Sequence, residues 1–261
     1  MKLFDSHCHL DDRSYDKDID AVIKRANDAG VEKMMIVGIN KKSSIKAVSL
    51  AESKSFLFAS VGIHPHDSKQ CDYKTLKFLR ALAGNPSVHA WGEIGLDFNR
   101  MYSPKIDQEL CFIKQIEIAD ELNLPIIFHE RDSNGRFLEI LKRHSKKRKG
   151  VVHCFSGNKT ELSAYLELGF YIGITGIITI KQRGANLRNM VSLIPREKIL
   201  IETDAPYLTP APIKNSIRRN EPAFVKSVLF KLAEAMGEDP VLLADQIWEN
   251  TCRLFNIRKD H

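Results

Sequence analysis

Short apolar segments alternate along the chain with longer segments of helical periodicity, and this alternation limits the possible folds more than any other feature. Segments such as KMMIVGI and KILIET are almost continuously apolar, as is expected of strands that are covered on both faces. A half-solvated antiparallel sheet would alternate apolar and polar residues instead. The pattern therefore predicts repeated βα units and a parallel sheet.

Eight segments are predicted to form strands, and six segments show the clearest helical pattern. The strands are residues 2–6, 33–38, 57–63, 88–94, 125–128, 151–152, 170–174 and 198–202, and the helices are 16–29, 108–122, 136–144, 160–168, 222–236 and 240–255. Eight parallel strands with intervening helices most simply close into a TIM-type (β/α)₈ barrel. An open, doubly wound sheet is the alternative, and the lack of a Gly-x-Gly-x-x-Gly motif after the first strand weakens it.

The length of the chain fits one barrel. It has 261 residues, of which 43% are hydrophobic and 28% charged, as in an ordinary globular protein. Barrels of this class commonly take about 250 residues as one unit, and no Pro/Gly/Ser-rich linker interrupts the sequence. We expect a single domain over residues 1–261.

The sequence favours a cytoplasmic protein. The first residues lack the apolar core and cleavage site of a secretory signal, and no apolar stretch is long enough to span a bilayer. The five cysteines are scattered without a Cys-x-x-Cys pair, so neither a disulfide framework nor a zinc knuckle is indicated. We expect no membrane association, and no obligatory protein partner is evident.

Candidate metal ligands follow the predicted strands, at the end of the barrel where active sites are built. His7 and His9 are two residues apart, so on extended backbone both imidazoles point to the same side while Cys8 points away. By the same alternation Cys154 should point away from His153. The predicted ligands are imidazoles and carboxylates, namely His7, His9, Glu93, His129, His153 and Asp204.

These ligands suffice for two divalent metal ions, magnesium, manganese or zinc, because a carboxylate such as Glu93 can bridge two cations. Asp204 can also accept the proton of a water molecule, so Glu93 and Asp204 are the predicted catalytic carboxylates. Taken alone, Glu93 could equally be a buried acid paired with an arginine, and Asp204 a turn residue before Pro206. Convergence of ligand-type residues from five strands favours the metal site. We interpret His89, His144 and His261 as ordinary histidines.

Basic residues outnumber acidic ones by 39 to 33, which favours an anionic partner only mildly. Their placement is more informative. Five arginines, some of them expected to be merely solvated, follow predicted strands: Arg100, Arg131, Arg183, Arg218 and Arg219. His64 and Asn220 could add hydrogen bonds to phosphate or sugar. The most basic run, residues 142–149, joins a helix to a strand and is therefore expected at the opposite face of the barrel.

At these motifs the chain resembles the TatD family of metal-dependent deoxyribonucleases, within the amidohydrolase-like barrel superfamily. The resemblance extends from residue 4 to about residue 255. It is carried by FDSHCHLDD, SVGIHPHD, WGEIGLDFNR, LPIIFHERD, VVHCFSG, YIGITG, LIETDAPYLTP and RRNEP. The resemblance implies that His7, His9, Glu93 and Asp204 hold one metal and that Glu93, His129 and His153 hold a second.

The resemblance further implies hydrolysis of phosphodiester bonds in DNA from a 3′ end, preferentially in single strands. The residues predicted to bind this substrate are His64, Arg131, Arg218, Arg219 and Asn220. Two alternatives remain. A metal-dependent hydrolase on the same barrel could cleave a cyclic amide, lactone or ester. A non-catalytic interaction module would carry no metal.

Overall fold

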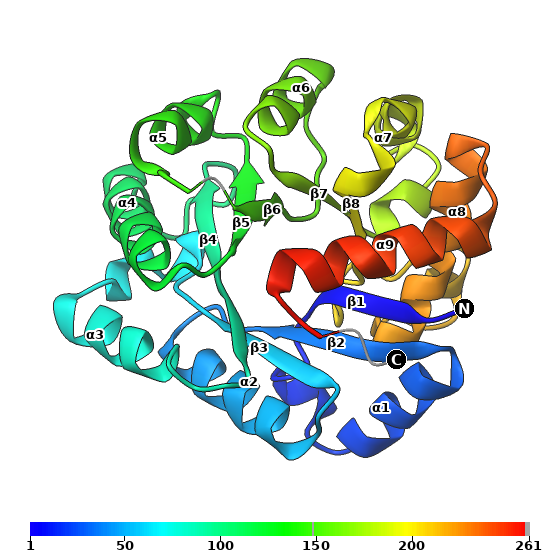
Figure 1. Ribbon diagram of the computed structural model, residues 1–261, viewed down its shortest axis with the longest axis horizontal. Coiled ribbons are helices and arrows are strands. Elements are labelled where there is room, and N and C mark those ends of the chain that lie inside the picture. The colour runs from blue at the N-terminus through cyan, green and yellow to red at the C-terminus, as the bar shows by residue number, and fades with distance from the viewer. Residues whose placement is uncertain (148, 259–261) are drawn as a thin grey trace.

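The computed structural model describes residues 1–147 and 149–258, and these form a single α/β domain in which eight parallel strands alternate with helices (Figure 1). Each strand pairs with the next in chain order, so all eight predicted strands are confirmed. The strands are β1 Leu3–Cys8, β2 Val31–Val37, β3 Leu57–Val61, β4 Val88–Asp97, β5 Ile126–Arg131, β6 Gly150–Val152, β7 Tyr171–Ile174 and β8 Ile199–Ile201. The predicted TIM-type barrel is therefore confirmed.

The helices surround the strands. They are α1 Ile19–Asp28, α2 Lys41–Ser53, α3 Tyr73–Leu82, α4 Lys105–Leu122, α5 Arg136–His144, α6 Lys159–Glu167, α7 Ala185–Met190, α8 Val225–Met236 and α9 Pro240–Phe255. The six predicted helices all form, with ends shifted by at most three residues. The sequence pattern did not single out α2, α3 and α7.

Two apolar layers hold the barrel together. The outer layer joins the strands to the surrounding helices, and the inner layer fills the barrel with side chains such as Phe4, Met35, Ile127 and Leu200. The last turn of α9 contributes Phe255 to the inner layer, and α9 crosses the barrel opening nearest the viewer in Figure 1. This end of the barrel is thus closed by packing, which leaves the opposite end for chemistry.

Strands β4 and β5 continue three residues beyond their predicted ends. Their ladder extends through Gly95 with His129 to Asp97 with Arg131. A Cβ atom on Gly95, whose φ is +152°, would lie 1.8 Å from the carbonyl oxygen of His129, so only glycine permits this pairing. Because of the extension, Glu93 and His129 lie within strands and not at their ends.

The basic run of residues 142–149 connects the end of α5 to the start of β6, as predicted, and so lies at the end of the barrel closed by α9. Arg148 in this run lies outside the described residues, as does His261. In the described part of the chain, no helix is both long enough and apolar enough to cross a membrane.

The sheet closes where β1 meets β8. The backbone N–H of Asp204 donates to the carbonyl of His7 at 2.9 Å, and that of His9 donates to the carbonyl of Ala205 at 2.7 Å. The buried carboxyl of Asp5 crosses the same seam and accepts from the backbone N–H of Thr203 at 2.9 Å and from its hydroxyl at 2.6 Å. Burial raises the pKa of Asp5 to about 8 against the effect of these hydrogen bonds.

Burial thus favours the protonated form of Asp5, and we expect Asp5→Asn to be tolerated. We expect Asp5→Ala to lower the free energy of unfolding by about 1–3 kcal/mol, because it leaves the polar groups of Thr203 buried without partners. Protonation of Asp5 stabilises the folded state fully below about pH 4, and this stabilisation is lost as the pH rises through about 8. Urea denaturation at several pH values measures both effects. Equal stability losses in the two variants, or the same pH dependence in Asp5→Asn as in the unmodified protein, would contradict this interpretation.

Candidate metal centre

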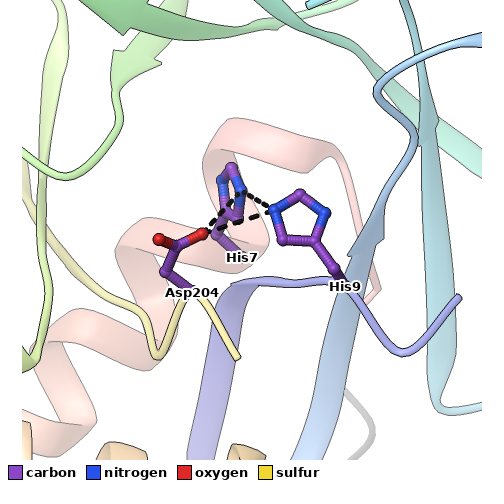
Figure 2. A group of neighbouring side chains, drawn as sticks. All are labelled: His7, His9 and Asp204. Carbon is purple, nitrogen blue, oxygen red and sulfur yellow. Dashed lines mark hydrogen bonds and ion pairs between the residues drawn. The ribbon is translucent and has the colours of Figure 1, made fainter. Parts of the chain in front are cut away.

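The six predicted ligands converge at the open end of the barrel, although they come from five segments of the chain. His7 and His9 lie at the end of β1, with Nε2 atoms 3.2 Å apart. The Oδ1 atom of Asp204, which follows β8, lies 3.7 Å from the Nε2 atom of His7 and 3.3 Å from that of His9 (Figure 2). Both imidazoles therefore face one carboxylate, as the spacing of the histidines predicts.

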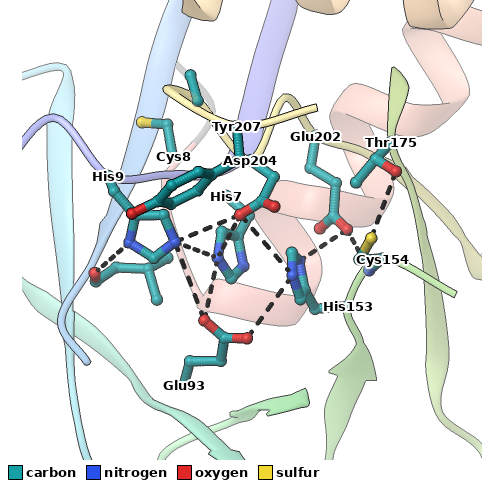
Figure 3. Close-up of polar contacts among 12 residues, drawn as sticks. His7, Cys8, His9, Glu93, His153, Cys154, Thr175, Glu202, Asp204 and Tyr207 are labelled. Carbon is teal, nitrogen blue, oxygen red and sulfur yellow. Dashed lines mark hydrogen bonds and ion pairs between the residues drawn. The ribbon is translucent and has the colours of Figure 1, made fainter. Parts of the chain in front are cut away.

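Glu93 lies in the middle of the cluster and divides its two oxygens between two groups of nitrogens. Its Oε2 atom is 3.5 Å from His7 Nε2 and 3.9 Å from His9 Nε2. Its Oε1 atom is 2.7 Å from His129 Nδ1 and 3.7 Å from His153 Nε2. Figure 3 shows the carboxylate between the His7–His9 pair and His153. A carboxylate with this arrangement is suited to bridge two cations.

The acceptor groups behind the histidines direct nitrogen lone pairs toward the centre. The Nδ1 atom of His9 lies 3.0 Å from the carbonyl oxygen of Val37, which can only accept, so Nδ1 carries the proton. The Nδ1 atom of His153 lies 2.9 Å from Glu202 Oε1, which favours the same tautomer (Figure 3). In both rings Nε2 is then free to bind a metal. This donor set of buried imidazoles and carboxylates fits a metal ion, and the groups together indicate a metal site.

His129 has a carboxylate on each side of its ring. Nδ1 faces Glu93, and Nε2 lies 3.4 Å from Asp97 Oδ2. Asp97 is almost fully buried and also lies 2.7 Å from Nε2 of His66. Asp97 is therefore positioned to orient the imidazole of His129 from behind, as Glu202 is for His153.

The electrostatics of the cluster keep its carboxylates ionised. Burial alone would raise the pKa of Glu93, but its interactions with His64, His153 and His129 lower it well below its ordinary value. Burial also opposes ionisation of Asp204, yet its interaction with His9 lowers the pKa of this carboxyl overall. Both groups are negative at neutral pH and can hold cations.

His64 also reaches the cluster. Its Nδ1 atom accepts a hydrogen bond from the backbone N–H of His66, so the proton lies on Nε2, 3.5 Å from Glu93 Oε1. Burial lowers the pKa of His64 to about 4. At neutral pH its side chain is therefore an uncharged hydrogen-bond donor facing the centre.

The cysteines stay out of the centre. The thiol of Cys8 donates to the carbonyl of Met35 at 3.4 Å and belongs to the outer apolar layer. The Sγ atom of Cys154 lies 3.4 Å from Thr175 Oγ1, away from the ligand nitrogens (Figure 3). Neither thiol joins the candidate ligand groups found among the described residues.

The other predicted substrate-binding residues lie in different environments. The side chains of Arg131 and Arg218 make no ion pair or hydrogen bond within the described residues. Arg219 is paired with the carboxylates of Asp18 and Glu221, and its guanidinium also covers a tyrosine ring. Asn220 is fully buried and donates to the carbonyls of two residues in the loop after β8, so it supports that loop.

Sequence reasoning did not assign a role to Glu202 or Asp97, although both are acidic residues at predicted strand ends. A Cβ atom on Gly173 would lie 2.6 Å from either carboxylate oxygen of Glu202, so the neighbouring strand leaves room for this side chain only through a glycine. The signal available in the sequence was their proximity to the predicted carboxylate ligands, since Asp97 follows Glu93 in GEIGLD and Glu202 precedes Asp204 in LIETDAPYL.

We expect Glu202→Ala to weaken metal binding about 10- to 100-fold, because His153 loses the acceptor that fixes its tautomer and orientation. Glu202→Gln should weaken binding less, since an amide oxygen can still accept from Nδ1. Calorimetric titration with Mn²⁺ or Zn²⁺ measures the affinities, and Glu167→Ala on the exposed end of α6 is the control. Unchanged affinity in Glu202→Ala would contradict a supporting role.

Comparisons with known proteins agree with this geometry. The family model described as TatD related DNase matches residues 4–256. The chain is 44% identical to 3'-5' ssDNA/RNA exonuclease TatD of Shigella flexneri, over 98% of this chain and 99% of the relative. It is 43% identical to the protein of that name from Escherichia coli, with the same coverage.

Among solved structures, the chain is similar to YJJV, a TatD homologue from Escherichia coli. The TM-score is 0.91, the sequence identity is 31%, and 98% of each chain is covered. A family match over almost the whole length, together with these sequence identities, establishes the family of the chain. The chain belongs to the TatD family of hydrolases, which act on phosphodiester bonds.

Proposed function

We propose that this protein is a metal-dependent 3′–5′ exonuclease that hydrolyses phosphodiester bonds in single-stranded DNA and RNA. The observation that carries the proposal is the buried carboxylate of Glu93, which presents one oxygen to the His7–His9 pair and the other to His129 and His153. The names of the relatives supply the substrate class and the direction of attack.

The site is proposed to hold two divalent ions, magnesium, manganese or zinc. One would be held by His7, His9, Glu93 and Asp204, and the other by Glu93, His129 and His153. When bound, such ions polarise a phosphoryl oxygen and lower the pKa of bound water. The protein's own contribution is a dry, preoriented set of donors, because the side chains of these ligands are at most 18% exposed.

Asp204 is the proposed general base. Its Oδ1 atom is the oxygen nearest to three histidines, whereas Oδ2 makes no hydrogen bond with any described residue. Its lowered pKa keeps the carboxylate ready to accept a proton from the attacking water at neutral pH. The second proposed catalytic carboxylate, Glu93, positions the reacting groups by joining the two halves of the cluster.

The phosphate of the substrate is proposed to contact several donors around the cluster. His64 offers Nε2–H as a neutral donor. Arg131 is half-buried at the end of β5 and Arg218 is exposed in the loop after β8, so both can approach an anion. Arg219 and Asn220 would act indirectly, by holding that loop through their existing hydrogen bonds.

An exposed aromatic ring beside the cluster supports a preference for unpaired bases. Tyr207 is 52% exposed, and its ring meets the His9 ring edge-on at a centroid distance of 5.9 Å. A base at the 3′ end of a single strand can stack on such a ring, whereas a paired base cannot.

The proposed compartment is the cytoplasm. All five cysteines are free thiols, which supports a reducing environment.

We expect Asp204→Asn to lower kcat about 10²- to 10⁴-fold, because a general base is lost. His129→Ala should also abolish hydrolysis, through loss of a metal ligand. The measurement is stepwise shortening of a 5′-labelled single strand in Mg²⁺, Mn²⁺ or Zn²⁺, with His89→Ala as the control at the closed end of the barrel. A second assay measures hydrolysis of a panel of lactones by the same enzyme preparation. Wild-type rates in Asp204→Asn, or cleavage of lactones without cleavage of DNA, would refute the proposal.

We expect Tyr207→Leu to raise KM for a single strand about 5- to 150-fold, the effect of losing about 1–3 kcal/mol of base stacking. Tyr207→Phe should retain the wild-type KM because the ring remains. Metal content, measured by elemental analysis, should be unchanged in both variants. Tyr73→Leu, at the exposed start of α3, is the matched control. A Phe variant as impaired as the Leu variant would exclude stacking as the cause.

A further inference from the structure

The loop between β4 and α4, residues 98–104, carries an exposed aromatic ring at the open end of the barrel. Tyr102 is 60% exposed, and its neighbour Met101 is 41% exposed. The rings of Tyr102 and His66 are nearly perpendicular, with centroids 4.7 Å apart. Because most of the tyrosine surface stays exposed despite this contact, the ring can still accept a stacked group.

One histidine connects Tyr102 to the metal centre. The ring centroid of His66 lies 6.2 Å from that of His129, a ligand of the proposed second metal. The Nε2 atom of His66 also lies 2.7 Å from Asp97 Oδ2, and the same oxygen lies 3.4 Å from His129 Nε2. A group stacked on Tyr102 would therefore lie beside the metal centre and not on a remote face of the barrel.

Buried hydrogen bonds hold the loop that carries this ring. Asp97 Oδ1 accepts from two backbone N–H groups of the loop, at 3.0 and 2.8 Å. Ser103, next to Tyr102, is fully buried, and its hydroxyl donates to the carbonyl of His66 at 2.8 Å. The carbonyl of Ser103 accepts from the buried side chain of Gln108 at 2.8 Å. The exposed ring thus has a fixed support, so little conformational freedom is lost when a ligand stacks on it.

A second exposed ring lies on the other side of the centre. Tyr207 follows β8, whereas Tyr102 follows β4, and in the closed sheet three strands separate β4 from β8 in either direction (Figure 1). Tyr207 adjoins His9, and Tyr102 adjoins His66. The cluster of candidate ligands therefore lies between two exposed aromatic rings. A strand whose scissile phosphate is held at this cluster has one base on each side of it.

We propose that Tyr102 stacks on the base of the penultimate nucleotide, on the 5′ side of the scissile bond, while Tyr207 stacks on the 3′-terminal base. This inference rests on the proposed exonuclease function and adds a second position at which the substrate is recognised. Every base has a π-face, so the contact holds the strand without selecting a sequence. In a duplex the penultimate base is stacked between its neighbours, so the contact requires an unpaired 3′ end.

The test uses two 5′-labelled single strands that differ only at the penultimate nucleotide, which carries a base in one strand and is abasic in the other. Removal of the first nucleotide is measured with the unmodified protein and with Tyr102→Leu. For the unmodified protein we expect the missing base to raise KM about 5- to 150-fold, the effect of losing one stacked base. In Tyr102→Leu, KM for the strand with the base should rise by a similar factor, and the two strands should no longer differ.

Two variants and a third strand serve as controls. Tyr102→Phe keeps the ring and should behave as the unmodified protein does. Phe230→Leu removes an exposed ring from α8, outside the barrel, and should change neither KM. A strand that is abasic only at its terminal nucleotide should still be discriminated against by Tyr102→Leu, because Tyr207 is intact.

Discrimination between the first two strands that is absent in the unmodified protein, or that persists in Tyr102→Leu, would overturn the inference while leaving the exonuclease intact. A lower kcat or metal content in Tyr102→Leu with an unchanged KM would overturn it as well, because Tyr102 would then act by supporting His66. Failure of the unmodified protein to shorten any of the strands would instead overturn the proposed function itself.

Discussion

The structure depends most on the burial of one negative charge, the carboxylate of Glu93, among imidazoles from several strands. A carboxylate with a side chain only 4% exposed is stable as an ion only if charges or donors compensate for its lost hydration. In this barrel the compensation comes from both sides, with His7 and His9 near one oxygen and His129 near the other. The same arrangement leaves the centre suited to cations, which can replace protons between these partners.

The barrel makes this cluster possible by separating packing from chemistry. Side chains inside the barrel and the last turn of α9 close one end with apolar contacts. At the other end the strands place polar side chains that point toward the barrel axis. Carboxylates behind these side chains hold the imidazoles in position. Glu202 behind His153 and Asp97 behind His129 have this role. Their buried carboxylates would be unfavourable without the imidazole N–H groups that they face.

Much of this architecture could be predicted from the sequence, because a parallel barrel repeats one unit and its strands are apolar on both faces. The His7-x-His9 spacing also predicted the facing imidazoles, since alternation along a strand is a local property. The extension of β4 and β5 could not be predicted, because the Gly95–His129 approach depends on two strands meeting. The pairing of Arg219 with Asp18 could not be predicted either, because Asp18 lies 201 residues earlier in the chain.

The charges around the cluster also come from segments that lie far apart in the sequence. The loop after β1 contains Asp11 and Asp12, whereas the segments after His129 and His153 contain both cations and carboxylates. Three loops far apart in sequence thus set the charge at the open end of the barrel together. An exonuclease must hold a long polyanion while it releases one nucleotide at a time. Arg131 and Arg218, which lie at the open end without an ion pair among the described residues, are donors suited to hold the backbone of such a strand without reading its bases.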